Sequence, residues 1–219
     1  MSGLTRLRGT EALTLELGAT LDLAAARALV PERFAIDEQD GVARANVLLF
    51  KMSGLTMSAL PVARFDYGEA LWRVSIRHEG APAWFAVKCD IDDPIVRALG
   101  GQLVKYPTRA ARIVGSEAKW RVEARASGAR DAAGSRLEVR VSDEDDAPVP
   151  ATRRTFVSRG ARVFEIPWEE IPPSRARSAR IAVLDAALLR ATLGESARLD
   201  DTGVVLRGRV HMCGFARRL

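Results

Sequence analysis

Alternating hydrophobic and polar positions recur along the chain and predict a sheet of mainly antiparallel strands. Residues 42–52, VARANVLLFKM, place Arg44, Asn46 and Leu48 on one strand face and Ala45 and Val47 on the other. The same pattern predicts strands over 71–78, 83–91, three segments between 109 and 142, 162–166, 179–184 and 202–215. A hairpin at 79–82 joins the first two of these, and a weaker alternation at 13–17 predicts an edge strand.

Three short helices are predicted near 22–30, 94–104 and 185–193. Asp22 is a suitable N-cap, proline follows two aspartates at Pro94, and Gly194 is a suitable helix stop. Residues 53–68 and 168–174 contain glycine or proline and are predicted to be loops. Because no βαβ alternation is present, we predict a mainly β (α+β) fold. The expected architecture is a highly curved antiparallel cone or barrel-like sheet with three peripheral helices, in one domain spanning 1–219.

Composition and charge narrow the class of protein. With 219 residues and 47% hydrophobic residues, the chain can bury a core without disulfides or metals. The net charge of +5 is scattered among acidic residues, so we expect no nucleic-acid partner. No signal peptide and no membrane-spanning window of about 18 apolar residues is present, and we expect a cytoplasmic protein. The preference for arginine and alanine indicates a GC-rich bacterial coding bias.

Metal and cofactor chemistry finds little support in the sequence. Cys89 and Cys213 lie in apolar stretches and are expected to be buried thiols. Only His211 and Cys213 could converge on one strand face, and that pair lacks further ligands, so we expect no metal and no cofactor. The chain also lacks the GxSxG nucleophile motif and a phosphate-binding glycine loop.

Two segments carry a more specific signal. Residues 100–109, GGQLVKYPTR, contain the frame Gly-x-x-Leu-x-x-Tyr-Pro, and residues 30–37 read VPERFAID. In this order and spacing the segments resemble the acetoacetate decarboxylase family, whose versions read roughly GREL-x-x-YPKK and VPEPL-x-ID. WFAVKCDIDDPIVRALGG at 84–101 and LLRATLG at 188–194 resemble an uncharacterised bacterial group of decarboxylase-like proteins even more. The resemblance implies the curved β fold and a homo-oligomer.

The family's catalytic residues do not carry over. In the family, a lysine after Tyr-Pro forms a Schiff base, and a neighbouring lysine lowers its pKa. The matching positions are Thr108, which cannot form an imine, and Arg109, which stays protonated. A family glutamate corresponds to Asn46, and the segment expected to hold a second one, 53–62, contains no acid. We therefore do not expect acetoacetate decarboxylase activity.

A ligand site can still be predicted from these positions. If the fold is correct, Asn46, Tyr106, Thr108 and Arg109 should approach one another at the mouth or interior of the sheet. Arg109, or Arg44 on the strand face of Asn46, would bind an anion through paired hydrogen bonds. The leading hypothesis is thus a protein that binds a small carboxylate or keto acid.

Two alternatives remain open. Lys88 or Lys105 could serve as the imine nucleophile of a lyase or hydratase-like enzyme; in that reading Lys88 shares a strand face with Trp84 and Ala86. The other alternative is a structural or partner-binding module that keeps only the fold. A lysine amine inside the pocket would favour the enzyme, and a pocket without convergent polar groups would favour the module.

Overall fold

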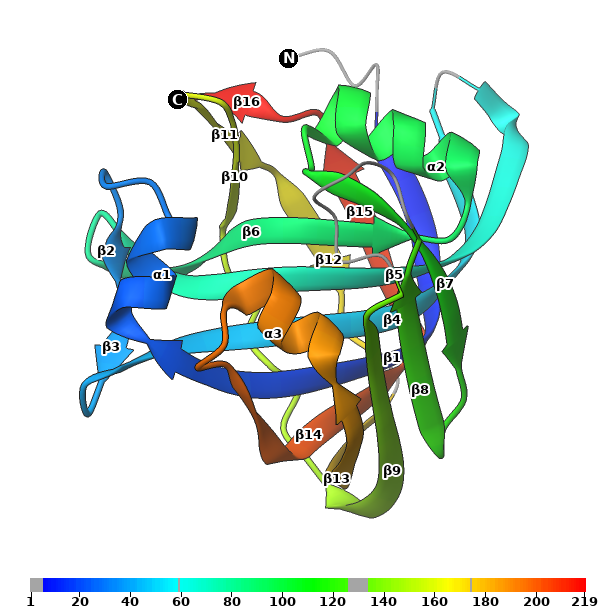
Figure 1. Ribbon diagram of the computed structural model, residues 1–219. Coiled ribbons are helices and arrows are strands. Elements are labelled where there is room, and N and C mark those ends of the chain that lie inside the picture. The colour runs from blue at the N-terminus through cyan, green and yellow to red at the C-terminus, as the bar shows by residue number, and fades with distance from the viewer. Residues whose placement is uncertain (1–5, 59, 126–133, 174) are drawn as a thin grey trace.

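A closed barrel of nine strands forms the centre of the computed structural model, which describes residues 6–58, 60–125, 134–173 and 175–219 (Figure 1). Around the barrel the order is β1 (Arg6–Asp22), β4 (Val42–Met57), β5 (Leu60–His78), β6 (Ala81–Ile91), β7 (Thr108–Gly115), β8 (Lys119–Ala124), β9 (Arg136–Asp146), β13 (Arg175–Ala186) and β14 (Arg198–Arg207), which pairs with β1. Only the β6–β7 pair among these is parallel. The predicted mainly β, barrel-like antiparallel sheet is confirmed.

Five of the remaining strands build a second wall beside the barrel: β10 (Thr155–Arg159), β11 (Arg162–Ile166), β12 (Trp168–Ile171), β15 (Arg209–Gly214) and β16 (Arg217–Arg218). The two-residue strands β2 (Ala35–Ile36) and β3 (Glu38–Gln39) pair instead with the barrel strands β5 and β4. Gly208, with φ +69°, separates β14 from β15, and β15 then pairs with both β1 and β12. β10 adds in parallel to β6 and leads into β11. The predicted closing strand is therefore two strands, which both pair with β1 but have different second partners, β13 and β12.

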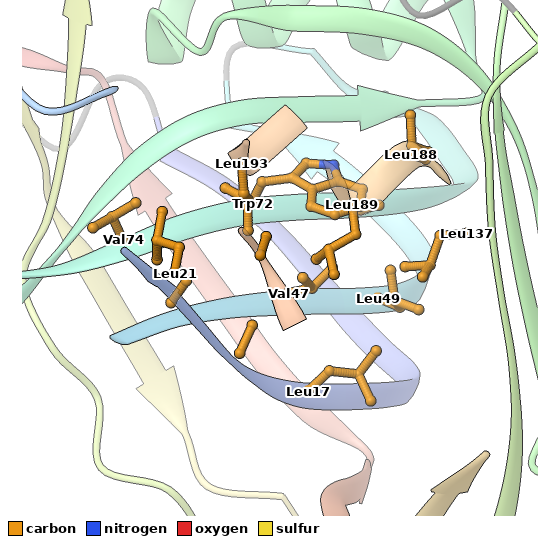
Figure 2. Close-up of a cluster of buried hydrophobic side chains, with 14 of the residues drawn as sticks. Leu17, Leu21, Val47, Leu49, Trp72, Val74, Leu137, Leu188, Leu189 and Leu193 are labelled. Atoms are coloured by element: carbon orange, nitrogen blue, oxygen red, sulfur yellow. The ribbon is translucent and has the colours of Figure 1, made fainter. Parts of the chain in front are cut away.

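Two hydrophobic cores lie on opposite faces of the long strands β4, β5 and β6. The first core fills the barrel with residues such as Val47, Leu49 and Trp72, all fully buried. Leu188, Leu189 and Leu193 of α3 (Ala187–Leu193) pack onto it (Figure 2). The second core lies between the barrel and the second wall. It contains Leu48 and Phe50 of β4, Leu71 of β5, Cys89 of β6, Val157 of β10 and Cys213 of β15. Side chains thus fill the barrel interior, and two cavities lie on the other face of these strands.

The three predicted helices are present and short. Asp22 caps α1 (Leu23–Leu29) by accepting from Ala25 N at 2.6 Å, and Asp93 caps α2 (Pro94–Leu99). After α2 the chain continues as a π-helical turn, η1 (Gly100–Val104), which Lys105 ends in the left-handed region. Among the described helices, none has the length and apolar character required to cross a bilayer.

The predicted loops and the predicted edge strand are wrong. β4 continues to Met57 and β5 begins at Leu60, while β12 occupies Trp168–Ile171. In 53–68 the register of β4 and β5 shifts on both sides of Leu55, and such bulges interrupt the alternation that marks a strand. β1 is not an edge strand, because it pairs with β4, β14 and β15 over 17 residues.

Candidate functional site

Two adjoining chambers lie between the outer face of the barrel and the second wall. Phe50, Trp168 and His211 border both of them. The first chamber is polar, and its wall includes Arg73, Trp84, Arg153, Glu170 and Arg209. The second chamber is mostly apolar, and its wall includes Leu7, Met52, Val104, Tyr67, Glu69 and Tyr106. The site therefore combines a polar chamber with a mostly apolar one, a combination typical of small-molecule pockets.

The chambers are small. Their cavity volumes are about 30 Å³ and about 50 Å³. Since one water molecule needs roughly 10 to 15 Å³ on this scale, the two together hold about six waters. Each chamber alone is too small for a ligand of about six or seven non-hydrogen atoms, which would have to extend into both.

A buried charge network forms one side of the site. Arg209 donates two hydrogen bonds to Glu11 Oε2, at 2.8 and 2.6 Å, and Thr14 donates a third at 2.5 Å. His211 Nε2 lies 3.0 Å from Glu11 Oε1 and 3.1 Å from Glu170 Oε1. Although burial opposes ionisation, His211 and Arg209 lower the pKa of Glu170 to about 2. The network therefore holds the Glu170 carboxylate in its charged form beside the imidazole.

Several buried polar atoms at the chambers have no hydrogen-bond partner. Within the described part of the chain these include the Tyr106 hydroxyl, Trp168 Nε1 and Nδ1 of His211. Tyr106 and His211 are 7% and 5% exposed, so bulk water does not satisfy them. Because an unpaired buried polar group costs about 1 to 3 kcal/mol, these atoms indicate a ligand that would pair with them.

Glu69 lies in the apolar part of the second chamber. Cys89 Sγ donates to its Oε1 at 3.1 Å, and the side chain is 5% exposed. Burial raises the pKa of Glu69 to about 7, with only partial compensation from Cys89 and Tyr67. Burial also raises the pKa of Cys89 well above its usual value and that of Cys213 to about 12. The two thiols are free and buried, as the sequence predicts.

Two arginines stack on Trp84 at the first chamber. The guanidinium carbons of Arg73 and Arg153 lie 4.7 and 4.9 Å from the ring centroid. Arg73 donates to Asn46 Oδ1 at 2.6 Å and lies 3.5 Å from Glu16 Oε1. Arg153 donates only to Ser75 Oγ at 3.3 Å, and no carboxylate of the described residues lies within ion-pair distance of it. Arg153 therefore retains the capacity to bind an anion.

Arg109, predicted as an anion anchor, lies on the barrel-interior face of the sheet. It makes two hydrogen bonds to Asp90, at 2.5 and 2.8 Å, and one to Thr192 of α3 at 3.0 Å. Trp72 Nε1 donates to the same carboxylate at 2.7 Å. The anion that Arg109 binds is thus a buried carboxylate of its own chain.

The other predicted binding residues do not converge. Asn46 lies on the chamber face, where it donates to Glu16 Oε1 at 2.9 Å and accepts from Arg73. Arg44 is half-exposed and lies near Gln39 and Asp200, outside the chambers. Tyr106 lines the second chamber, but Thr108 borders a hollow on the outer surface. Asn46 thus contacts Glu16 and Arg73, which line the first chamber, but does not line it itself. Of the predicted binding residues, Tyr106 alone belongs to the described chamber walls.

None of the four lysines of the chain lines either chamber. Lys105 donates to Gln102 O and borders the outer hollow. A bulge in β6 pairs Trp72 with Lys88 but Arg73 with Ala86, so the strand alternation changes at Val87. As a result Cys89, not Lys88, continues the chamber face after Ala86. Among the described residues, no group of three or more His, Cys, Asp or Glu side chains could hold a metal ion.

Sequence reasoning missed Glu69, Arg153 and the Glu11–Arg209 pair. The signal for Glu69 is visible, because it shares a strand face with Tyr67 and Leu71, opposite the buried Ala70 and Trp72. Arg153 lies in an irregular segment, and Glu11 and Arg209 are 198 residues apart. No local pattern brings these residues together.

Substitution of Asp90 tests whether the Asp90–Arg109 pair stabilises the fold. Asp90→Asn removes the charge that neutralises a buried guanidinium, and the free energy of unfolding should fall by about 3 to 5 kcal/mol. Glu123→Gln, which breaks the exposed pair with Arg121, should cost at most about 1 kcal/mol. Urea unfolding followed by circular dichroism measures both. Equal, small losses would show that Arg109 does not depend on Asp90.

Glu69 should make stability depend on pH. In the unfolded chain its carboxyl ionises near 4.5, whereas in the folded protein it stays protonated up to about 7. The folded state thus binds the extra proton between these values, and the free energy of unfolding falls as pH rises from 4.5 to 7, by up to about 3 kcal/mol. Glu69→Gln should flatten this part of the profile. The lowered pKa of Glu170 changes the free energy of unfolding only below about pH 4.5, outside the range in which Glu69 acts. If the free energy of unfolding changes with pH in the same way in the wild type and in Glu69→Gln, the raised pKa of Glu69 is contradicted.

The sequence matches no family model and no curated protein. Solved structures are similar in fold over nearly the whole chain. The enduracididine biosynthesis enzyme MppR, complexed with pyruvate, has a TM-score of 0.65 at 14% identity, covering 98% of this chain and 89% of that one. Acetoacetate decarboxylase from Legionella pneumophila scores 0.68 at 11% identity over 97% and 86%. An acetoacetate decarboxylase-like enzyme from Sphingomonas wittichii RW1 scores 0.64 at 16% identity over 100% and 94%. Its barrel, its second wall and these likenesses together give this chain the acetoacetate decarboxylase-like fold.

Proposed function

We propose that the protein binds a small keto acid in the two chambers and does not decarboxylate it through a Schiff base. The observation that carries this proposal is the set of unpaired, buried polar atoms on Tyr106, Trp168 and His211 at a small, otherwise apolar cavity. A carbonyl oxygen accepts hydrogen bonds from a hydroxyl and an indole N–H, which are the donors available there. The cavity volumes favour an acid of the size of pyruvate or 2-oxobutanoate.

The carboxylate end of such a ligand would lie at the first chamber. Arg153 has a planar guanidinium, stacked on Trp84, without a carboxylate partner among the described residues. Arginine binds a carboxylate through two parallel hydrogen bonds, and stacking limits the rotamer freedom that binding removes. The short carbon chain would then contact the apolar wall of the second chamber.

The absence of lysine from both chamber walls supports binding without an imine. A Schiff base requires a neutral amine that reaches the carbonyl carbon, and Lys88 and Lys105 lie outside the chamber walls. MppR, a protein of similar fold, has been solved with pyruvate bound, which supports a keto acid as the ligand class. The convergent polar groups also disfavour a module that keeps the fold without a ligand.

Titration of 2-oxobutanoate tests the proposal, with intrinsic fluorescence as the readout because Trp84 and Trp168 border the first chamber. We expect saturable binding to the wild-type protein. Arg153→Gln should weaken binding about 10- to 100-fold, since a hydrogen bond to a charged group is worth about 1.5 to 3 kcal/mol. Arg121→Gln, on the outer face of the barrel, is the matched control and should leave the affinity unchanged.

Borohydride reduction in the presence of 2-oxobutanoate separates this proposal from the lysine-dependent alternative. We expect the intact mass of the protein to stay unchanged. An adduct at Lys88 or Lys105 would establish imine chemistry and contradict the proposal, as would an affinity that Arg153→Gln does not alter.

A further inference from the structure

The surroundings of the His211 imidazole suggest a role beyond holding the keto acid in the chambers. It borders both chambers, is 5% exposed and packs edge-on against Trp168, with ring centroids 4.8 Å apart. Its Nε2 faces the carboxylates of Glu11 and Glu170 at 3.0 and 3.1 Å. Because Nε2 faces these carboxylate oxygens, it is the nitrogen that donates a proton to them, and in the singly protonated tautomer the lone pair lies on Nδ1.

That Nδ1 has no hydrogen-bond partner in the described part of the chain. Many proton-transfer sites contain a histidine that a neighbouring carboxylate orients through one ring nitrogen, while the other nitrogen is free to accept a proton. Glu11 and Glu170 would act here as positioning residues, because Arg209 and Thr14 hold Glu11 while Thr152 donates to Glu170. Tyr106, whose hydroxyl is also buried and unpaired, lines the same second chamber.

We propose that His211 removes a proton from the carbon next to the carbonyl group of the bound keto acid while Tyr106 hydrogen-bonds to the carbonyl oxygen. The protein would thus catalyse keto–enol interconversion without a lysine. This inference rests on the keto-acid binding proposed above and adds a reaction to it.

The step is balanced without any further reactant. For 2-oxobutanoate, the C3–H bond breaks and its proton moves to Nδ1 of His211. The electron pair of that bond forms the C2=C3 double bond, and the C2=O π pair moves onto oxygen, where the Tyr106 hydroxyl stabilises the negative charge. Return of a proton to C3 restores the keto acid.

Other groups at the chambers fit this role less well. Cys89 and Cys213 are buried thiols whose pKa burial raises, so neither supplies a thiolate. Glu69 already accepts a hydrogen bond from Cys89. Among the described chamber residues, His211 has both features: one ring nitrogen lies beside two carboxylates, and the other has no hydrogen-bond partner.

Deuterium exchange tests the proposal. The protein is incubated with 2-oxobutanoate in deuterated buffer, and the C3 proton signal is followed by NMR. We expect exchange faster than in buffer alone. His211→Gln should lower the rate at least about 100-fold, the usual contribution of a general base, while 2-oxobutanoate still binds. Tyr106→Phe should lower it about 100-fold through loss of the oxygen's donor.

Three variants serve as matched controls. His78→Gln removes the other histidine, which packs on Phe34 and Phe156 away from the chambers. Lys88→Arg and Lys105→Arg remove the two candidate imine nucleophiles. All three should exchange at the wild-type rate. If His211→Gln does not fold, Tyr106→Phe carries the test, because it removes only an unpaired hydroxyl.

Binding is measured by fluorescence in the same samples, so that the two proposals fail in different ways. Binding without exchange would overturn the enolisation step and leave the binding function standing. Absence of binding would overturn both. Exchange at the wild-type rate in folded His211→Gln, or loss of exchange in Lys88→Arg, would also overturn the step.

Discussion

The structure depends on three strands, β4, β5 and β6, that are buried on both faces. In β4, Ala45 through Phe50 are all buried, with Val47 and Leu49 facing the barrel core and Leu48 and Phe50 facing the second wall. Because side chains alternate along a strand, one residue of register decides which core each side chain enters. The barrel face is filled by close packing, and the helix α3 closes it. The other face borders the two chambers, so the strands separate a tightly packed core from the candidate site.

Buried polar groups on the two faces of the sheet differ in how completely their hydrogen bonds are satisfied. On the barrel face, Asp90 and Arg109 neutralise each other, and Trp72 and Thr192 complete their hydrogen bonds. On the chamber face, Glu11 and Arg209 form a similar pair, but Tyr106 and the His211 ring keep unpaired atoms. A buried network is favourable when every member is satisfied and costly when one is not. The contrast between the two faces is the physical basis for considering the chambers a functional site and the Asp90 cluster a structural one.

The sequence predicted the fold class, the three helices and most of the strands, because period-two alternation and helix caps are local signals. It failed at 53–68 and 168–174, where bulges and short strands interrupt the alternation. A motif points to Tyr106, which lines the second chamber, whereas spacing alone puts Lys88 on the strand face of Trp84 and Ala86, because the bulge at Val87 leaves no local signal. The charge network could not be predicted, since Glu11, Glu170 and Arg209 meet only after β1, β12 and β15 pair.

The most direct measurement is a crystal structure of the protein grown with saturating 2-oxobutanoate. The account predicts density for the acid within the two chambers, its carboxylate on Arg153 and a carbonyl oxygen within hydrogen-bond distance of the Tyr106 hydroxyl. Density continuous with a lysine side chain, an acid bound only in the outer hollow beside Lys105, or empty chambers would contradict the central claim that these unpaired polar groups serve a ligand.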